Sequence, residues 1–239
     1  MNTRQTLILG NERFRVGPWH ADPDIAYLSL TPDVPRPSVD GLHRCMRRLT
    51  DEGYSSVITA ALHPDEARPF LELGFEEYDR LRVLGHSLED LDPPHRRPGR
   101  AVRLRRARHA DRQAALAVDG RAFPPFWQLD DDGLDEAIRA TPKSRFRVAE
   151  RAGTVIGYAV TGRAGSQGFL QRLATDPEHQ GDGVASSLVL DALHWAARRR
   201  VRRVLVNTQE GNARALALYR QLGFELTPTA LVVLSRPVP

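Results

Sequence analysis

The sequence predicts an α/β fold with a mixed sheet that is built twice along one chain. Three observations predict it. Segments with the two-residue period of strands alternate with segments of helical period, which is typical of α/β domains. The run EARPFLELGF at residues 66–75 returns as ALALYRQLGF at residues 215–224, an offset of 149 residues that indicates an internal duplication. A proline-rich stretch, LDPPHRRPGR at residues 91–100, separates the two runs.

The composition is that of an ordinary globular protein. Of 239 residues, 41% are hydrophobic and 27% charged, which excludes a disordered or collagen-like chain. Cys45 is the single cysteine, so a disulfide scaffold and a zinc site of several thiolates are excluded. No apolar run has the roughly 18 residues of a membrane helix, and residues 1–14 do not have the pattern of a signal peptide. We expect a cytoplasmic protein without a membrane partner or a metal site.

The charge permits anionic ligands. The formal net charge is +4, and Lys143 is the only lysine among 34 basic residues. The arginines are spread along the chain and interleaved with 30 acidic residues. Nucleic acid is therefore not expected as a partner, although an arginine face would be invisible in sequence.

The proline-rich stretch is interpreted as a linker, with one domain at residues 1–90 and another at 101–239. In the second domain the periodicity predicts strands at 101–106, 144–150, 154–162, 169–174, 201–206, 224–226 and 230–235. It predicts helices at 111–118, from Asp130–Asp132 to about Thr141, from Val184 to about Arg198, and at 212–222. In the first domain it predicts strands at 6–9, 13–16, 25–30, 56–61 and 75–83, with helices at 39–49 and 65–73.

The segment FLQRLATDPEHQGDGVASS at residues 169–187 carries the first chemical signal. A strand ends, a turn follows, and Gln180 to Ala185 open a helix. Glycines let backbone N–H groups converge on one point, and the helix N-terminus adds free donors and positive dipole charge. The segment predicts a pyrophosphate site. The alternative is a glycine-rich turn that only leads into a helix.

The segment VLVNTQEGNARALALYRQLGF at residues 204–224 carries the second signal. A buried strand leads into a helix whose expected N-cap is Asn212. Tyr219 is seven residues further on, so both residues lie on nearly the same helix face, two turns apart. On its own, a tyrosine on an apolar helix face is normally a core residue.

Together the two segments resemble the GNAT superfamily of N-acyltransferases. The family's phosphate loop, Q/R-x-x-G-x-G/A, is matched by Gln180, Gly183 and Ala185. Its motif N-x-x-A-x-x-L-Y-x-x-x-G-F is matched by Asn212, Ala215, Leu218, Tyr219, Gly223 and Phe224. The resemblance spans residues 101–239, and this half also resembles the ribosomal-protein alanine N-acetyltransferases. It implies a tandem GNAT fold with a degenerate first copy and an intact second copy.

The resemblance implies acetyl-CoA as co-substrate and a set of residues that bind it. Backbone groups of Leu173, Ala174 and Thr175 would face the acetyl and pantetheine arm, one of their N–H groups stabilising the oxyanion. The pyrophosphate would lie on Gln180, Gly181, Asp182, Gly183, Val184, Ala185 and Ser186. Asn212 would contact the pantetheine, and Tyr219 would act as general acid or hydrogen-bond donor to the departing thiolate. Asp182 departs from relatives, which often carry Arg or Lys there.

The general base is not assigned by the resemblance. Relatives of the alanine acetyltransferase type carry a glutamate where this chain has Asn207, which cannot take a proton. The open alternatives are Glu150, Glu210, His179, a water chain, or an amine that arrives already neutral.

The acceptor would enter beside RAFPPFWQLDDD at residues 121–132. Phe123, Phe126 and Trp127 would line its pocket, and Asp130–Asp132 would attract a cationic amine. Alternatively, the aromatic side chains fill the core and the acids cap the next helix.

In the first half, Phe70 stands where Tyr219 stands in the second, and His63 falls opposite Asn212. The segment opposite the phosphate loop, PDVPRPSVDG at residues 32–41, has three prolines. We interpret this half as a non-catalytic copy, as in the tandem acyltransferases such as mycothiol synthase.

The expected function is acetyl-CoA-dependent transfer of an acetyl group to a primary amine, on a protein N-terminus or a small molecule. The alternative is a non-catalytic acyl-CoA sensor. The acceptor, the acyl length and the oligomeric state stay open.

Overall fold

The computed structural model describes residues 4–19, 22–31, 36–89, 91 and 102–238. The chain forms two compact units, each made of segments distant in sequence. The first comprises the described residues of Met1–Val83, Gln209–Gly211 and Pro228–Pro239, and the second comprises those of Leu84–Thr208 and Asn212–Thr227. Apart from Leu91, the expected linker lies outside the described residues.

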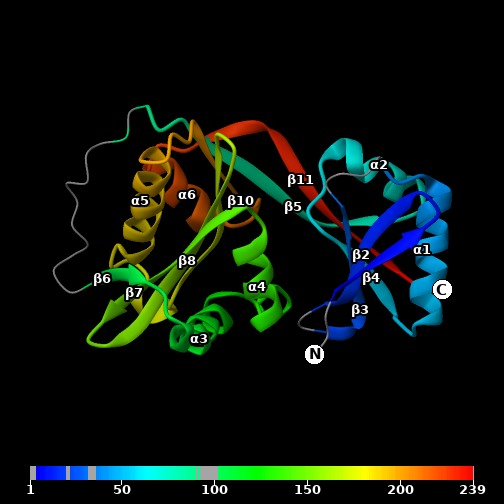
Figure 1. Ribbon diagram of the computed structural model, residues 1–239, viewed down its shortest axis with the longest axis horizontal. Coiled ribbons are helices and arrows are strands. Elements are labelled where there is room, and N and C mark those ends of the chain that lie inside the picture. The colour runs from blue at the N-terminus through cyan, green and yellow to red at the C-terminus, as the bar shows by residue number, and fades with distance from the viewer. Residues whose placement is uncertain (1–3, 20–21, 32–35, 90, 92–101, 239) are drawn as a thin grey trace. The chain divides into compact units, whose positions relative to one another are not determined.

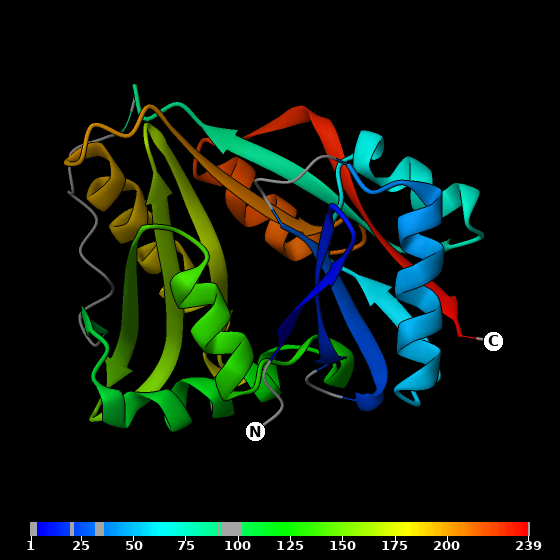
Figure 2. The same cartoon turned by 45° about the vertical axis from the view of Figure 1, so that its right-hand side comes forward.

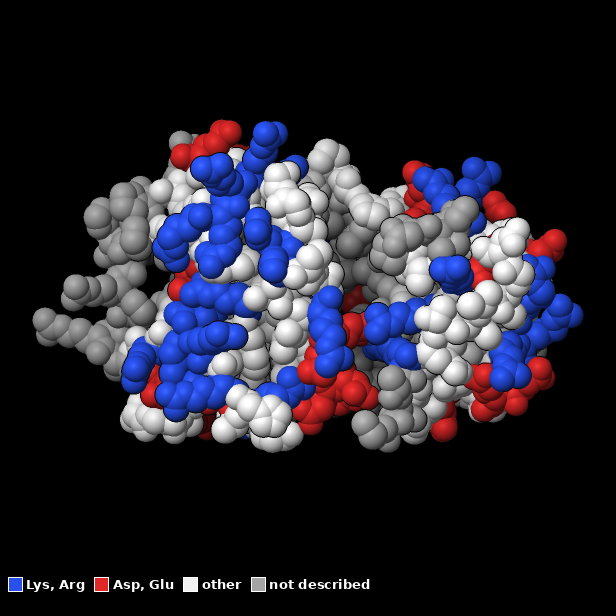
Figure 3. Space-filling view, viewed as in Figure 1, with Lys and Arg blue, Asp and Glu red and all other residues white. Residues whose placement is uncertain are grey.

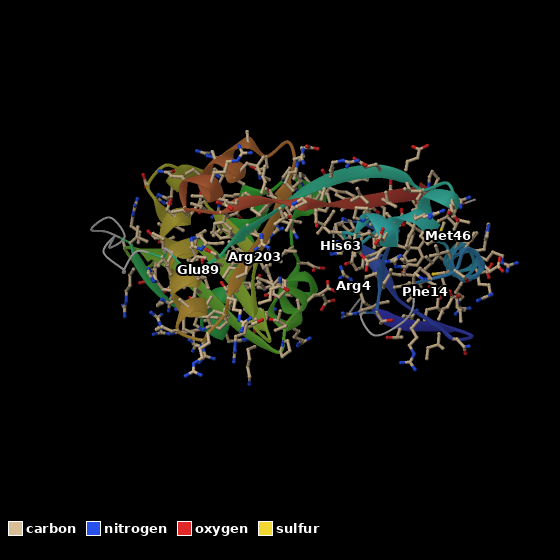
Figure 4. All side chains as sticks on the ribbon, turned by 90° about the horizontal axis from the view of Figure 1, so that it is seen from above. Arg4, Phe14, Met46, His63, Glu89 and Arg203 are labelled. Carbon is tan, nitrogen blue, oxygen red and sulfur yellow. The ribbon has the colours of Figure 1, made fainter. Side chains whose placement is uncertain are left out.

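The first unit contains a strand-rich start followed by alternating helices and strands (Figure 1). Phe14 and Met46, labelled in Figure 4, belong to its core, in which α1 and α2 pack on the strands. Its elements are β1 (Gln5–Leu9), β2 (Glu12–Trp19), β3 (Asp22–Leu30), α1 (Val39–Asp51), β4 (Ser56–Thr59), α2 (Pro64–Glu72) and most of β5 (Glu76–His86).

In the second unit, helices cover both faces of the strands (Figures 1 and 2). One cluster of buried side chains lies between the strands and α5 and α6, and another lies under α3 and α4. The elements are β6 (Arg103–Arg106), η1 (His109–Asp111), α3 (Arg112–Ala122), η2 (Pro125–Trp127), α4 (Asp131–Arg139), β7 (Lys143–Arg151), β8 (Thr154–Ala164), β9 (Gln167–Thr175), η3 (Pro177–His179), α5 (Val184–Ala197), β10 (Arg203–Gln209) and α6 (Ala213–Gln221). The last strand, β11 (Glu225–Pro237), starts in this unit and continues in the first from Pro228. No described helix is long and apolar enough to cross a membrane.

The sheet is mixed, as the sequence predicts. Hydrogen-bonded neighbours follow the order β1-β2-β3-β4-β11-β5-β10-β9-β8-β7-β6. In the first unit β3 pairs in parallel with β4, and in the second β9 pairs in parallel with β10. The β1–β2, β2–β3, β6–β7, β7–β8 and β8–β9 pairs are antiparallel.

The duplication predicted from the sequence is visible in the elements. Helices α2 and α6 have nine residues each, and both their first and last residues lie 149 positions apart. Strands β5 and β11 start at the same offset. From β1 in the first copy and from β7 in the second, the described elements therefore follow the same order of three strands, a helix, a strand, a helix and a last strand. The second copy has β6, α3 and α4 in addition, before β7.

The last strand differs from the sequence prediction. Two strands, at 224–226 and 230–235, were expected on either side of Pro228, whereas β11 runs unbroken over Glu225–Pro237. Pro228 lies where β11 leaves the second unit and enters the first. A residue without an N–H donor thus lies at the boundary between the two units and not in the middle of either one.

Candidate active site

One edge of β9 has free backbone groups near the strand's end. β9 pairs with β8 along its whole length, from Gln167 to Thr175. Among the described residues, its parallel ladder with β10 covers only Gln167–Phe169 against Arg203–Leu205. Alternate N–H and C=O groups between Leu170 and Thr175 therefore have no β10 partner, and an extended ligand could pair with them as an added strand would.

Two buried polar atoms lie in the same stretch without a partner. The β8–β9 register shifts between Val160 and Thr161, which leaves Gln171 as an extra residue in β9, the signature of a β-bulge. Oε1 of Gln171 and Oγ1 of Thr175 are buried and have no hydrogen-bond partner among the described residues. Because such groups are rare in native proteins, the second half of β9, from Gln171 to Thr175, is a candidate place for a ligand.

A short turn connects β9 to the loop. Pro177 cannot continue the ladder, and Asp176 accepts a hydrogen bond from the Glu178 N–H at 3.2 Å, which caps η3. Arg121 of α3 donates to the same carboxylate at 2.6 Å. Burial raises the pKa of Asp176, but the hydrogen bonds from Arg121 and the Glu178 N–H outweigh it, so the pKa lies below its usual value. The turn is thereby held to α3.

The loop after this turn has the backbone that the sequence predicts. Gly181 and Gly183 have φ of +95° and +78°, the left-handed region that side chains disfavour. A Cβ on either residue would meet no atom within 4 Å, so the backbone conformation, and not lack of space, demands glycine there. α5 starts at Val184, and the N–H groups of its first turn have no intrahelical acceptor. The N-terminus of α5, with its free N–H donors and its positive dipole end, therefore directly follows the glycine loop.

Asn212 and Tyr219 are presented by α6. The Asn212 side chain accepts from the Ala215 N–H at 3.0 Å and so caps the helix, as predicted. Tyr219 is 5% exposed, and its ring lies 5.5 Å from that of Phe224. It belongs to the same cluster as Val206 of β10, and Leu173 of β9 packs against that cluster. Burial raises the pKa of the Tyr219 phenol, so it is protonated at neutral pH.

These elements lie within one recognisable family match. Residues 112–224 match the model of the Acetyltransferase (GNAT) family. They form a GNAT domain. The match includes the β9 edge, the glycine loop and α6, and it confirms the family that the loop and α6 motifs indicate.

Curated relatives are similar to about two thirds of this chain. The mycothiol acetyltransferase of Saccharomonospora viridis is 33% identical over 183 residues, covering 70% of this chain and 60% of the relative. That of Amycolatopsis mediterranei is 31% identical over 179 residues, covering 68% and 59%. The chain thus spans about 60% of the length of these relatives.

Solved structures show the tandem fold. A tandem GNAT protein from the clavulanic acid biosynthesis pathway superposes with a TM-score of 0.67 at 15% identity, covering 95% of this chain and 79% of that one. A GCN5-related N-acetyltransferase from Kribbella flavida gives 0.65 at 18% identity, covering 98% and 90%. At such identities the likeness concerns the fold alone.

The three side chains considered as general base are all in ion pairs or hydrogen bonds. Glu150 accepts from Arg105 at 2.7 Å, and His179 lies 3.6 Å from Asp182. Glu210 pairs with Arg82, and both residues belong to the first unit instead of the GNAT domain. Asn207 is exposed on β10.

The predicted acceptor wall, formed by Phe123, Phe126 and Trp127, is held by contacts between its aromatic rings and with Arg172. Phe126 and Trp127 lie edge to face in η2, with ring centroids 5.1 Å apart. The Arg172 guanidinium lies over the Phe123 ring, with 3.6 Å between its Cζ atom and the ring centroid. Asp130 caps α4 through the Gly133 N–H at 2.7 Å, as the alternative interpretation of the acidic residues expects.

Sequence reasoning missed the group that holds this wall in place. Asp119 of α3 is fully buried and accepts from Arg172 of β9 and from the Tyr158 hydroxyl of β8. Arg172 also donates to the Trp127 carbonyl at 2.7 Å, and Asp119 accepts from the Leu129 N–H at 2.8 Å. The only available signal was an aspartate among apolar residues of a helix, AALAVDG at residues 114–120.

In the described residues of the first unit, the N-terminus of α1 differs from that of α5. α1 follows β3 as α5 follows β9, but the carboxylate of Glu12 lies at its N-terminus. Glu12 accepts from the Ser38 N–H at 2.5 Å and from Arg44 at 3.0 Å. The protein's own anion therefore occupies the position where α5 offers open donors. Part of the expected counterpart segment, residues 32–35, lies outside the described residues.

Proposed function

We propose that this protein is an acetyl-CoA-dependent N-acetyltransferase that transfers an acetyl group to a primary amine by direct attack on the thioester. The family match supports acetyl transfer, and the curated relatives are named mycothiol acetyltransferases. The acceptor is a primary amine on a small molecule or a protein N-terminus.

One observation carries the proposal. The free edge of β9 runs directly into the Asp176 turn and the open glycine loop at the N-terminus of α5. An elongated molecule with an amide-containing arm and a diphosphate would satisfy both parts at once. The arm would pair with Leu173, Ala174 and Thr175, and the diphosphate would lie on the N–H groups from Gln180 to Ser186.

The residues present fit such a co-substrate. Thr175 lacks a hydrogen-bond partner for its buried hydroxyl, and the arm's amides would supply one. Asn212 uses its side-chain oxygen as a cap, and its NH₂ group would be the donor to the arm. When bound, acetyl-CoA supplies the activated acetyl thioester.

The chain's own groups would then assist the transfer. The amine nitrogen forms the new bond to the acetyl carbon, and the carbon–sulfur bond breaks. The proton that the nitrogen loses passes through water and replaces the one that Tyr219 gives to the sulfur. A backbone N–H near Leu173 stabilises the oxyanion, and the Tyr219 hydroxyl gives a proton to the leaving sulfur. Because the Tyr219 pKa is raised, the residue holds that proton at neutral pH. Holding amine and thioester together supplies much of the rate, since effective molarities reach ~10⁵ M or more.

A non-catalytic acyl-CoA sensor is the second candidate. It is favoured by the partners of Glu150, Glu210 and His179, which leave none of the three positioned as an evident base. The enzyme requires in its place an amine that arrives neutral or a water chain.

Release of free CoA thiol from acetyl-CoA, measured against a panel of small amines and N-terminal peptides, separates the two. An enzyme gives amine-dependent release that Tyr219→Phe reduces. Leu226→Gln, a change of an exposed side chain, serves as the control and leaves release unchanged. Tight binding of acetyl-CoA without release on any amine would instead support the sensor.

A further inference from the structure

Two side chains of the glycine loop hold arginines from outside the loop. Asp182 binds Arg151, which ends β7, and Gln180 binds Arg214, which lies in the first turn of α6. Neither arginine is close to the loop in sequence. The loop therefore positions guanidinium groups that no motif contains.

Arg151 offsets the negative charge that Asp182 brings to the loop. Nη1 of Arg151 donates to Oδ2 of Asp182 at 2.7 Å and lies 3.3 Å from Nδ1 of His179. A lone carboxylate at this point would repel a diphosphate on the neighbouring N–H groups. The hydrogen bond from Arg151 lowers the pKa of Asp182. Nε of Arg151 is buried and has no partner among the described residues.

The Arg214 contact joins the loop to α6. Nη1 of Arg214 donates to Oε1 of Gln180. The Nε2 group of the same glutamine donates to the Thr175 carbonyl at 3.4 Å. Gln180 thus links the end of β9 to the arginine. Arg214 is exposed, and no carboxylate partner is found for it among the described residues.

We propose that Arg151 and Arg214 bind the phosphate groups of coenzyme A from the two sides of the loop, with Asp182 and Gln180 as the residues that position them. This inference rests on the proposed function. The backbone N–H groups are neutral donors, whereas charge-assisted hydrogen bonds from guanidinium to phosphate are about twice as strong. The two arginines also supply positive charge next to a loop, residues 180–186, in which the one charged side chain is that of Asp182.

The test is calorimetric titration of the full chain with CoA. Arg151→Gln and Arg214→Gln are each expected to weaken binding about tenfold, equivalent to about 1.4 kcal/mol. Arg151→Lys keeps the charge but loses the planar fork, so its loss is smaller. Arg139→Gln is the matched control, since it removes an arginine from an exposed ion pair on α4 and leaves binding unchanged.

Repeating the titration with 3′-dephospho-CoA identifies the phosphate. If an Arg→Gln variant weakens binding of 3′-dephospho-CoA as much as binding of CoA, that arginine contacts the diphosphate. If it weakens binding of CoA alone, that arginine contacts the 3′-phosphate. A double-mutant cycle tests positioning. Asp182→Asn added to Arg151→Gln should recover part of the lost affinity, because it removes a carboxylate left without its partner.

Wild-type affinity for CoA in both glutamine variants would overturn the inference and leave the proposed function intact. Failure of the wild type to bind CoA would overturn both.

Discussion

Arg172 and Asp119 form a buried ion pair that joins β9 to α3. Nε and Nη2 of the arginine donate to the two carboxylate oxygens at 2.8 and 2.7 Å, and Asp119 is 0% exposed. The strand that offers its free edge at Leu173 is thereby tied, one residue earlier, to the helix that leads into the predicted acceptor wall. The same ion pair therefore positions both the β9 edge and the predicted acceptor wall.

Removing one partner of this pair should be costly. Arg172→Met leaves a buried carboxylate without its main donor, and such changes cost about 3–5 kcal/mol. Tyr158→Phe removes one neutral hydrogen bond to the same carboxylate and should cost about 1–2 kcal/mol. Urea denaturation of the full chain, followed by circular dichroism, measures both. Equal stabilities of the two variants would contradict the assigned roles.

The acid stability of the GNAT domain should depend on Asp111. The side-chain hydrogen bond from Arg105 is the main cause that lowers the Asp111 pKa from 3.8 to about 2. Because the folded pKa is below the unfolded one, this stabilisation is complete above about pH 4 and is lost as the pH falls toward 2. The thermal midpoint of Arg105→Met should therefore change less than that of the wild type between pH 4 and pH 2. Parallel pH curves for the two proteins would argue against it.

Tyr219→Phe tests the proton donor. The change removes the hydroxyl but keeps the ring that packs near Phe224, so folding and CoA affinity should be unaffected. Turnover should fall about 10²-fold, the lower end of general acid catalysis. The wild-type rate should show no loss from tyrosine ionisation near pH 9–10, because burial raises the Tyr219 pKa. A fall in affinity with unchanged turnover would assign the residue to binding.

The aromatic wall gives a separate prediction for the acceptor. Replacing Phe126 and Trp127 by alanine should raise KM for the amine about tenfold or more while Kd for acetyl-CoA stays the same. The backbone of the wall is held by Arg172 and Asp119, so it should keep its place. Steady-state kinetics at fixed acetyl-CoA provides the measurement. An unfolded double variant would mean that the two rings serve the core.

The sequence was informative where structure depends on neighbours along the chain. The left-handed glycines of the loop, the Asn212 cap and the strand–helix order up to the last strand follow from local spacing, and they are found. The passage of β5 and β11 from one unit into the other was not predicted, because strand pairing between segments distant in sequence leaves no local period. Asp119, Arg151 and Arg214 were missed for a related reason. Each resembles an ordinary polar residue until the fold brings its partner to it.

Calorimetric titration of the full chain with acetyl-CoA tests the central claim most directly. The account predicts one site per chain, because the N-terminus of α5 is open and that of α1 is occupied by Glu12. Gly183→Val, which forces a β-branched residue to φ +78°, should abolish binding, and the same change at exposed Gly165, also in the left-handed region, should not. Two sites per chain, or binding that survives Gly183→Val, would contradict the account.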